Sequence, residues 1–139
     1  MVLIVSNPPV QRVIDPPGIA SPAAQYAHAV LVEHATRWLH TSGVVPTAPD
    51  GSVPPGVSAQ AGQVWHNIAA MLSEAGMGPQ NIVSVTTYLV ASAMTPGLAQ
   101  AMAARDAFLG GRRVASTLVT VPALVRPEWL VEIAVVAAG

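Results

Sequence analysis

Apolar residues recur along this chain with two different periods, and each period predicts a different kind of element. A spacing of three and four residues, which is typical of one face of a helix, joins Val57, Ala61, Val64, Ile68 and Leu72. We expect an amphipathic helix here that ends near Gly76, because glycine readily adopts the left-handed conformation that closes many helices. Residues 82–90 instead form a β-branched run, which favours a strand.

Two further β segments are predicted in the first third of the chain. Residues 2–5 form a short apolar run that predicts a strand, and a proline-rich loop follows it. Residues 26–32 and 37–42 hold clustered or alternating apolar residues on either side of a polar link. This arrangement is typical of a hairpin, so we expect two antiparallel strands.

The last third predicts a second helix and two strands. Thr95 and Pro96 open a helix, since proline is well suited to the first helical turn, and Gly110 ends it. Residues 112–118 and 129–136 then form two strand-like runs. The order of elements predicts an α+β fold in which two helices cover one face of a sheet, and we expect residues 1–139 to form one domain.

Glu132 is a carboxylate inside the otherwise apolar run of residues 129–136. An ionised side chain is costly to bury without a partner, so this position indicates a lined pocket or an interface rather than plain core. The alternative is an ion pair with Arg126, with Arg113 or with a group of another subunit. Glu132 is therefore the first functional candidate.

Composition narrows the range of functions. With 52% hydrophobic and only 9% charged residues, the chain is predicted to bury a face against identical copies. A net charge of -1 argues against nucleic acid as a partner, and the absence of cysteine excludes disulfides and thiolate chemistry. The apolar runs are shorter than the roughly 18 to 20 residues of a membrane span. No basic region precedes an apolar stretch, so we expect a cytoplasmic protein.

The motifs do not support a metal site or a phosphate-binding loop. The four histidines do not form a helical metal pair, and we expect no metal site. His28 and His40 could face each other across the predicted hairpin, but two histidines without a third ligand are more often structural. No glycine-rich phosphate loop is present, and we expect no cofactor.

Five segments together resemble the Rid family (YjgF/YER057c/UK114), and they occur in that family's order. They are residues 26–32, 41–43, 63–68, 82–88 and the pair formed by Ser116-Thr117 with residues 131–133. The resemblance covers essentially the whole chain. It implies a chorismate-mutase-like mixed sheet with two helices on one face, a homotrimer with clefts between subunits, and hydrolysis of reactive enamines and imines to 2-oxo acids and ammonia.

The resemblance also exposes one departure from the family. In the family's imine hydrolases, an arginine directly before the Ser-Thr pair binds the substrate carboxylate. Ala115 occupies the position of this arginine here. The chain is thus a divergent member that lacks the substrate-carboxylate arginine. Arg113 lies two residues earlier, on the same face of a strand and about 6 to 7 Å away. It either serves a longer acid or is a surface or subunit-interface arginine.

The remaining site residues follow from the same resemblance. Glu132 matches the acidic position that orients the attacking water, and Thr117 could donate a hydrogen bond or be an ordinary strand threonine. Tyr26 matches the pocket tyrosine, with a packing role as its alternative. Ser42 and Gly43 match the pocket wall. Met102 replaces an asparagine and, with Ala115, makes the predicted cleft more apolar.

Two functions from different classes remain open. In the first, the protein hydrolyses or tautomerises an imine or enamine other than a simple 2-imino acid. In the second, a trimer binds a small apolar metabolite, or stabilises other enzymes, without catalysis. Ala115 and Met102 favour the second function or an altered substrate, whereas Glu132 favours retained chemistry.

Overall fold

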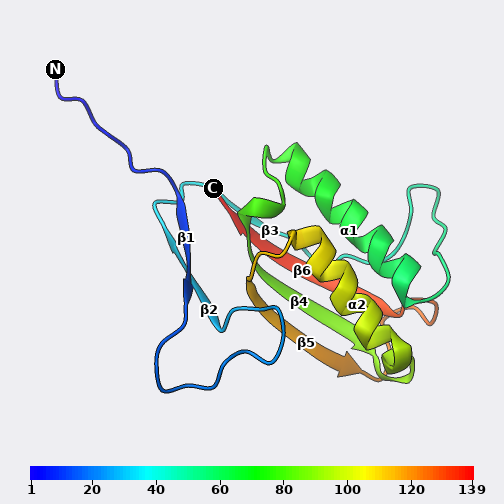
Figure 1. The fold of residues 1–139 in the computed structure, drawn as a ribbon. Helices are drawn as coiled ribbons and strands as arrows, with labels where there is room; N and C mark the ends of the chain where they lie inside the picture. The colour runs from blue at the N-terminus through cyan, green and yellow to red at the C-terminus, as the bar shows by residue number, and fades with distance from the viewer.

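Two long helices lie side by side on one face of a four-stranded sheet, and a separate two-stranded ribbon extends beside it (Figure 1). The structure is a computed structural model that describes residues 1–139. The strands are β1 (Val10–Ile14), β2 (Ala29–Glu33), β3 (Trp38–His40), β4 (Ile82–Val90), β5 (Ala115–Val121) and β6 (Val131–Ala138). The helices are α1 (Val57–Glu74) and α2 (Met94–Leu109), with short 3-10 turns at η1 (Pro79–Asn81) and η2 (Ala91–Ala93).

The larger sheet is mixed and has the order β3-β6-β4-β5. Strand β6 is antiparallel to both β3 and β4, whereas β4 and β5 are parallel. Parallel neighbours need a crossover connection, and α2 supplies it between β4 and β5. The predicted fold class, two helices on one face of a mixed sheet, is confirmed.

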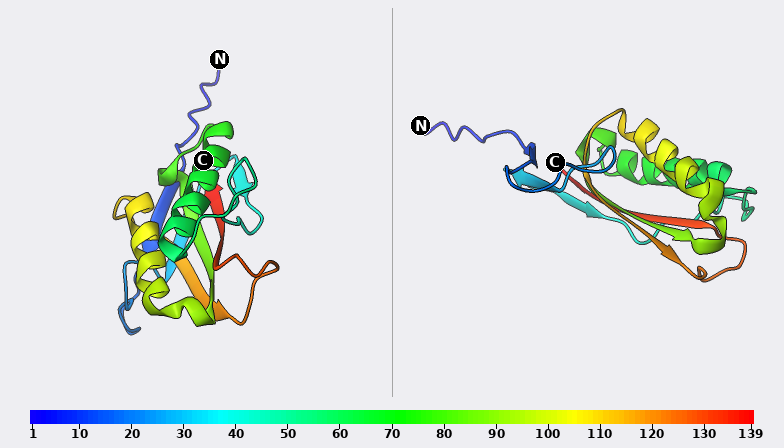
Figure 2. Two further views of the ribbon diagram at one scale, coloured as in Figure 1. Left: turned by 90° about the vertical axis from the view of Figure 1, so that its right-hand side faces the viewer. Right: turned by 60° about the horizontal axis from the view of Figure 1, so that its bottom comes forward.

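The two faces of the sheet differ in burial. Along β6, buried residues alternate with half-buried ones from Val131 to Val136, because successive side chains of a strand point to opposite faces. The buried set faces the helices, and Glu132 belongs to the other set. Figure 2 shows that both helices lie on the same side, so the opposite face has no helix over it. Glu132 therefore lies outside the core, on what we call the helix-free face.

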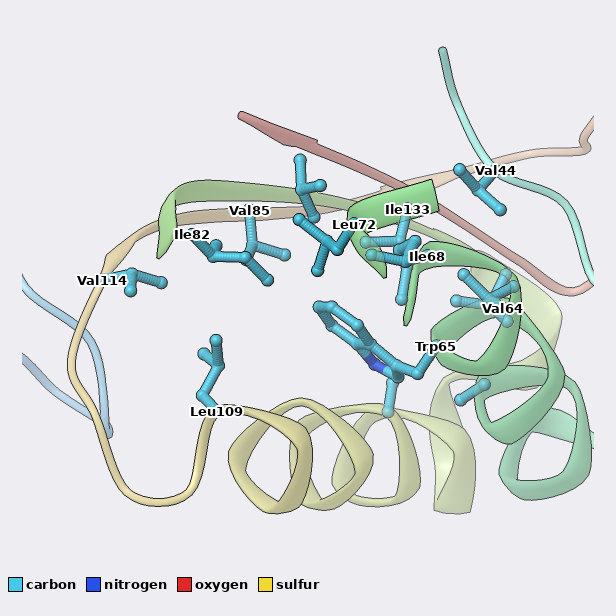
Figure 3. Packing of buried hydrophobic residues seen from close by; sticks show 14 of the residues in the cluster. Val44, Val64, Trp65, Ile68, Leu72, Ile82, Val85, Leu109, Val114 and Ile133 are labelled. Atoms are coloured by element: carbon cyan, nitrogen blue, oxygen red, sulfur yellow. The ribbon is translucent and has the colours of Figure 1, made fainter. Parts of the chain in front are cut away.

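The core lies between the helices and the sheet. Ile68 and Leu72 of α1 are fully buried, and both belong to the same apolar cluster as Ile133 of β6 (Figure 3). Trp65 stacks on Phe108 of α2 with a centroid distance of 4.5 Å, which joins the two helices. The spacing of three and four residues thus predicted the buried face of α1 correctly.

Several element boundaries agree with the sequence. Helix α1 closes before Gly76, which has φ of 69°, and α2 is capped by Gly110 at φ of 61°. Strand β4 spans the predicted residues 82–90. The last two strands begin two to three residues later than expected, at Ala115 and Val131. Neither long helix has the length and apolar character needed to cross a bilayer.

The strand predicted at residues 2–5 is wrong. Val2 and Ile4 are 88% and 90% exposed, and the first strand is β1, which begins at Val10 inside the segment expected to be loop. Figure 1 shows this N-terminal segment extending away from the rest of the chain. A strand needs a partner for its backbone groups, and an apolar β-branched run alone does not provide one.

The predicted hairpin of residues 26–32 and 37–42 is also wrong. Strand β2 pairs with β1, while β3 pairs with β6 in the larger sheet. The chain turns away after β2 at His34, whose φ is 61°, and the amides of Thr36 and Arg37 then donate to the Gly139 carbonyl. These two bonds direct β3 toward the end of β6 rather than back along β2.

Candidate functional site

One groove between α2 and the start of β5 collects several of the predicted site residues. We call it the α2–β5 groove. It has a volume of about 420 Å³ and is lined by Ala24, Tyr26, Leu98, Met102, Arg105, Ser116, Thr117 and Leu118. Tyr26, Met102 and Thr117, which are far apart in the sequence, therefore line one groove.

A short parallel contact places Tyr26 at this groove. The Ala27 amide donates to the Val114 carbonyl at 2.9 Å, and Ala27 is bridged to Ala115. The Tyr26 hydroxyl accepts a hydrogen bond from the Ala23 amide at 3.4 Å. Because that bond uses an oxygen lone pair, the phenolic proton stays free to donate. Tyr26 can therefore act as a hydrogen-bond donor toward the groove.

Arg105 is a lining residue that the sequence analysis did not identify. It is only 4% exposed, and its Nη1 donates to the Ser116 hydroxyl at 3.2 Å. Its Nε donates to the Asp106 carboxylate at 2.9 Å. The available signal was the helical spacing, since Arg105 follows Met102 by three residues and shares its face of α2. The groove thus contains a cation despite Ala115.

Glu132 and Gly43 form a second set of neighbouring residues on β6 and the segment after β3. The Val44 amide donates to the Ile133 carbonyl at 2.7 Å, and the Ile133 amide donates back to Val44 at 3.1 Å. A Cβ atom at Gly43 would lie 2.7 Å from Cδ of Glu132, closer than real Cβ contacts. Gly43 is therefore required for the Glu132 side chain to occupy its present place.

Ser42 and Gly43 also line a groove of about 560 Å³, formed mainly by residues 39–49 together with Asn67 and Met71 of α1. Asn67 fixes this wall, because its side-chain amide donates to the carbonyls of Val45 and Thr47. Glu132 is not among the lining residues of this groove. The predicted pocket-wall residues thus lie next to the carboxylate and at the border of an open groove.

The two sets of residues do not meet within one chain. Glu132 of β6 pairs with Tyr88 of β4. Thr117 of β5 pairs with Thr86 at the other edge of β4. Two strand spacings separate β6 from β5, which amounts to roughly 10 Å. Tyr88 lies between them on the helix-free face, and the sequence analysis did not identify it as a neighbour of Glu132. A single subunit therefore presents two separate candidate half-sites, one at Glu132 and Gly43 and the other in the α2–β5 groove.

Arg113 and Ala115 contribute to neither half-site. Arg113 forms an ion pair with Asp15 at 2.8 Å, and it borders a cavity of about 550 Å³ beside the loop of residues 15–24. Ala115 is half-buried where it bridges Ala27, and it lines none of the five cavities.

The two groups whose pKa is shifted, Asp50 and Arg112, lie away from both half-sites. Hydrogen bonds from the hydroxyl and amide of Ser52 hold the pKa of the Asp50 carboxyl below its usual value. Partial burial lowers the pKa of the Arg112 guanidinium, which donates to the carbonyl of Pro79 and to the side chain of Gln11. Arg112 therefore ties β1 to the turn before β4. No cluster of three acidic or histidine side chains could hold a metal ion.

Known proteins resemble this chain in sequence and in fold. Residues 18–139 match the sequence model of a protein family described as endoribonuclease L-PSP. The chain is similar to YyfB, a Rid-family protein of unknown function from Yersinia pestis, at 33% identity and a TM-score of 0.80. This alignment covers 92% of this chain and 98% of YyfB. No curated protein matches the chain.

Two further solved structures are similar to the chain. YyfA, a second Rid-family protein from Yersinia pestis, is 28% identical with a TM-score of 0.67, and the alignment covers 94% of this chain and 100% of YyfA. A YjgF-family protein from Neisseria meningitidis is 25% identical with a TM-score of 0.63, over 93% of this chain and 94% of that one. The fold and the sequence signal therefore point to the same group of proteins.

Proposed function

Because this chain belongs to the Rid family, whose sequence model is described as endoribonuclease L-PSP, we propose that it hydrolyses or tautomerises an imine or enamine other than a simple 2-imino acid. The observation that carries this proposal is the Glu132 carboxylate, which lies on the helix-free face with Gly43 against it. The two half-sites would come together in clefts between the subunits of a trimer.

An exposed apolar surface on the helix-free face supports such an assembly. Trp38 and Val119 lie on that face and are 52% and 42% exposed. Large apolar side chains in this position are typical of surfaces that other protein covers. A cyclic trimer would bring the Glu132 half-site of one subunit to the α2–β5 groove of the next, because each subunit offers one of each.

The proposed reaction adds water across a carbon–nitrogen double bond. Glu132 accepts a proton from water while the water oxygen attacks the imine carbon, and it then passes this proton to the nitrogen, which gives a neutral aminoalcohol. The hydroxyl proton of the aminoalcohol moves through Glu132 to the nitrogen as the carbon–nitrogen bond breaks, which releases ammonia and leaves a carbonyl group. An enamine first gains a proton on carbon and loses one from nitrogen to become the imine. Tyr26 and Thr117 would donate hydrogen bonds that orient the substrate in the groove.

The walls of the groove indicate which substrates fit. Ala115 leaves no cation at the position where the family's imine hydrolases bind a 2-carboxylate. Met102, Leu98 and Leu118 instead line the groove with apolar side chains. These residues favour a substrate with an apolar part and without a carboxylate next to the imine carbon.

The same apolar walls favour one alternative, a trimer that binds a small apolar metabolite without chemistry. The alternative predicts that ligands bind in the groove and that Glu132 has no effect on them. The family description suggests RNA cleavage, but the chain has no basic groove that would bind RNA. Of the six arginines, Arg105 is buried, and four others contact groups inside the chain: Arg37, Arg112, Arg113 and Arg126.

The proposal is tested by ammonia release from imines generated in situ. An amine oxidase supplies imines without a 2-carboxylate, and an amino-acid oxidase supplies 2-imino acids. We expect the unmodified protein to accelerate hydrolysis of the first group only, and Ala115→Arg to gain activity on the second. Acceleration of neither group by either protein would overturn the catalytic proposal in favour of the binding one.

A further inference from the structure

Arg105 is one of three buried polar residues in the chain, and the only charged one, at 4% exposure. Burying a guanidinium is costly unless its N–H groups are satisfied and its charge is balanced. Its position is set by α2, where Arg105 reaches toward Ser116 of β5. A buried cation at the border of a groove needs an explanation that a surface arginine does not.

The contacts inside the chain leave this guanidinium incompletely satisfied. Nε donates to Oδ1 of Asp106 and Nη1 donates to Ser116. Nη2 forms an ion pair with the same Oδ1 at 2.9 Å, which balances the charge, but the two atoms are not aligned for a hydrogen bond, so Nη2 is buried without a hydrogen-bond acceptor. A guanidinium has five N–H donors, and a single carboxylate oxygen and one hydroxyl do not use them all. Arg105 retains donor capacity.

The α2–β5 groove places apolar surface beside this donor. Arg105, Ser116 and Tyr26 supply N–H and O–H groups, while Leu98, Met102 and Leu118 supply apolar walls. The phenolic proton of Tyr26 is free, since its oxygen accepts from the Ala23 amide. A ligand that matches both parts combines an anionic group with a short hydrocarbon chain.

We propose that Arg105 and Ser116 form a carboxylate-binding site in the α2–β5 groove, which selects ligands with one carboxylate on a short apolar chain. A carboxylate is favoured over a phosphate because the nearby Asp106 would repel a second negative charge. This inference rests on the proposed function and deepens it. The substrate class becomes an imine or enamine whose carboxylate lies away from the imine carbon, held by α2 rather than by position 115.

The ordinary role of such an arginine is to tie a helix to a strand. In that case Arg105 would contribute to stability and would not distinguish charged ligands from uncharged ones. A charge-assisted hydrogen bond to a ligand carboxylate is stronger than a neutral one, so ligand charge separates the two roles.

The test compares butyrate with its uncharged isostere butyramide, titrated against the full-length protein and followed by NMR chemical shifts. We expect the unmodified protein to bind butyrate about tenfold more tightly or better, with shifts at Ser116 and Leu118. Arg105→Met should abolish this preference. Arg113→Met is the matched control, because it removes an arginine paired outside the groove, and it should retain the preference.

Equal binding of butyrate and butyramide by the unmodified protein would overturn the inference, whether or not Arg105→Met folds. So would a preference that survives in Arg105→Met or that disappears in Arg113→Met. Binding is measured without turnover, so failure of the proposed catalysis would leave this result unaffected. Conversely, imine hydrolysis without any preference for butyrate would overturn the carboxylate site alone.

Discussion

Replacing Glu132 with glutamine is expected to lower the rate of imine hydrolysis by about 100 to 10,000-fold, the contribution typical of a general base. Glutamine keeps the size of the side chain and its place beside Gly43, but it cannot accept the proton of water. Because Glu132 is half-buried on the helix-free face and outside the core, the free energy of unfolding should change by less than about 1 kcal/mol. Steady-state ammonia release and urea unfolding measure the two effects.

Glu128→Gln is the matched control. Glu128 is exposed in the loop before β6, and its backbone carbonyl, rather than its side chain, accepts a hydrogen bond from Gln60. This variant should retain full activity. Equal activity of Glu132→Gln and the unmodified protein would remove Glu132 from the mechanism and favour a binding role for the trimer.

Replacing Ile68 with alanine is expected to lower the free energy of unfolding by about 2 to 5 kcal/mol. Ile68 is fully buried between α1 and the sheet, so the shorter side chain leaves a cavity that the surrounding helices and strands fill only in part (Figure 3). Urea unfolding at one fixed protein concentration measures the loss, since association makes the stability of an oligomer depend on its concentration.

Val2→Ala provides the comparison for this core substitution. Val2 is 88% exposed and lies outside every strand, so its truncation should change the free energy of unfolding by less than about 0.5 kcal/mol. A loss below about 1 kcal/mol for Ile68→Ala would contradict the close packing of Ile68 between α1 and the sheet.

The elements whose sequence pattern depends on local burial were predicted well. The spacing from Val57 to Leu72 gave the buried face of α1, because one helix face meets the sheet. The β-branched run of residues 82–90 gave β4, a central strand with neighbours on both sides. Membership of the Rid family was also confirmed, since the family's sequence model matches residues 18–139.

Strand partners could not be predicted in the same way. Residues 2–5 have the composition of a strand but no pairing strand in the chain, while β1 forms near prolines because β2 pairs with it. The hairpin prediction failed because bonds from Thr36 and Arg37 to Gly139 connect segments about a hundred residues apart. A pattern along the chain contains no information about such distant hydrogen bonds.

Some of the residues named from the sequence lie near one another in the structure, but their arrangement could not be predicted. Tyr26, Met102 and Thr117 do line one groove, and Glu132 does lie against Gly43. Arg105 was not identified, because its burial depends on the way α2 packs on β5. The separation of the two half-sites depends on strand order, which places β4 between them. The roles of these residues stay predictions.

Subunit complementation tests the central claim that one active cleft takes a half-site from each of two subunits. Glu132→Gln removes the carboxylate, and Tyr26→Ala removes the tyrosine of the α2–β5 groove. Each variant alone should be far less active in imine hydrolysis than the unmodified protein. Mixed trimers assembled from equal amounts should regain about a quarter of the unmodified activity, since an intact cleft needs one suitable half-site from each neighbour. No recovery in verified mixed trimers would contradict the claim.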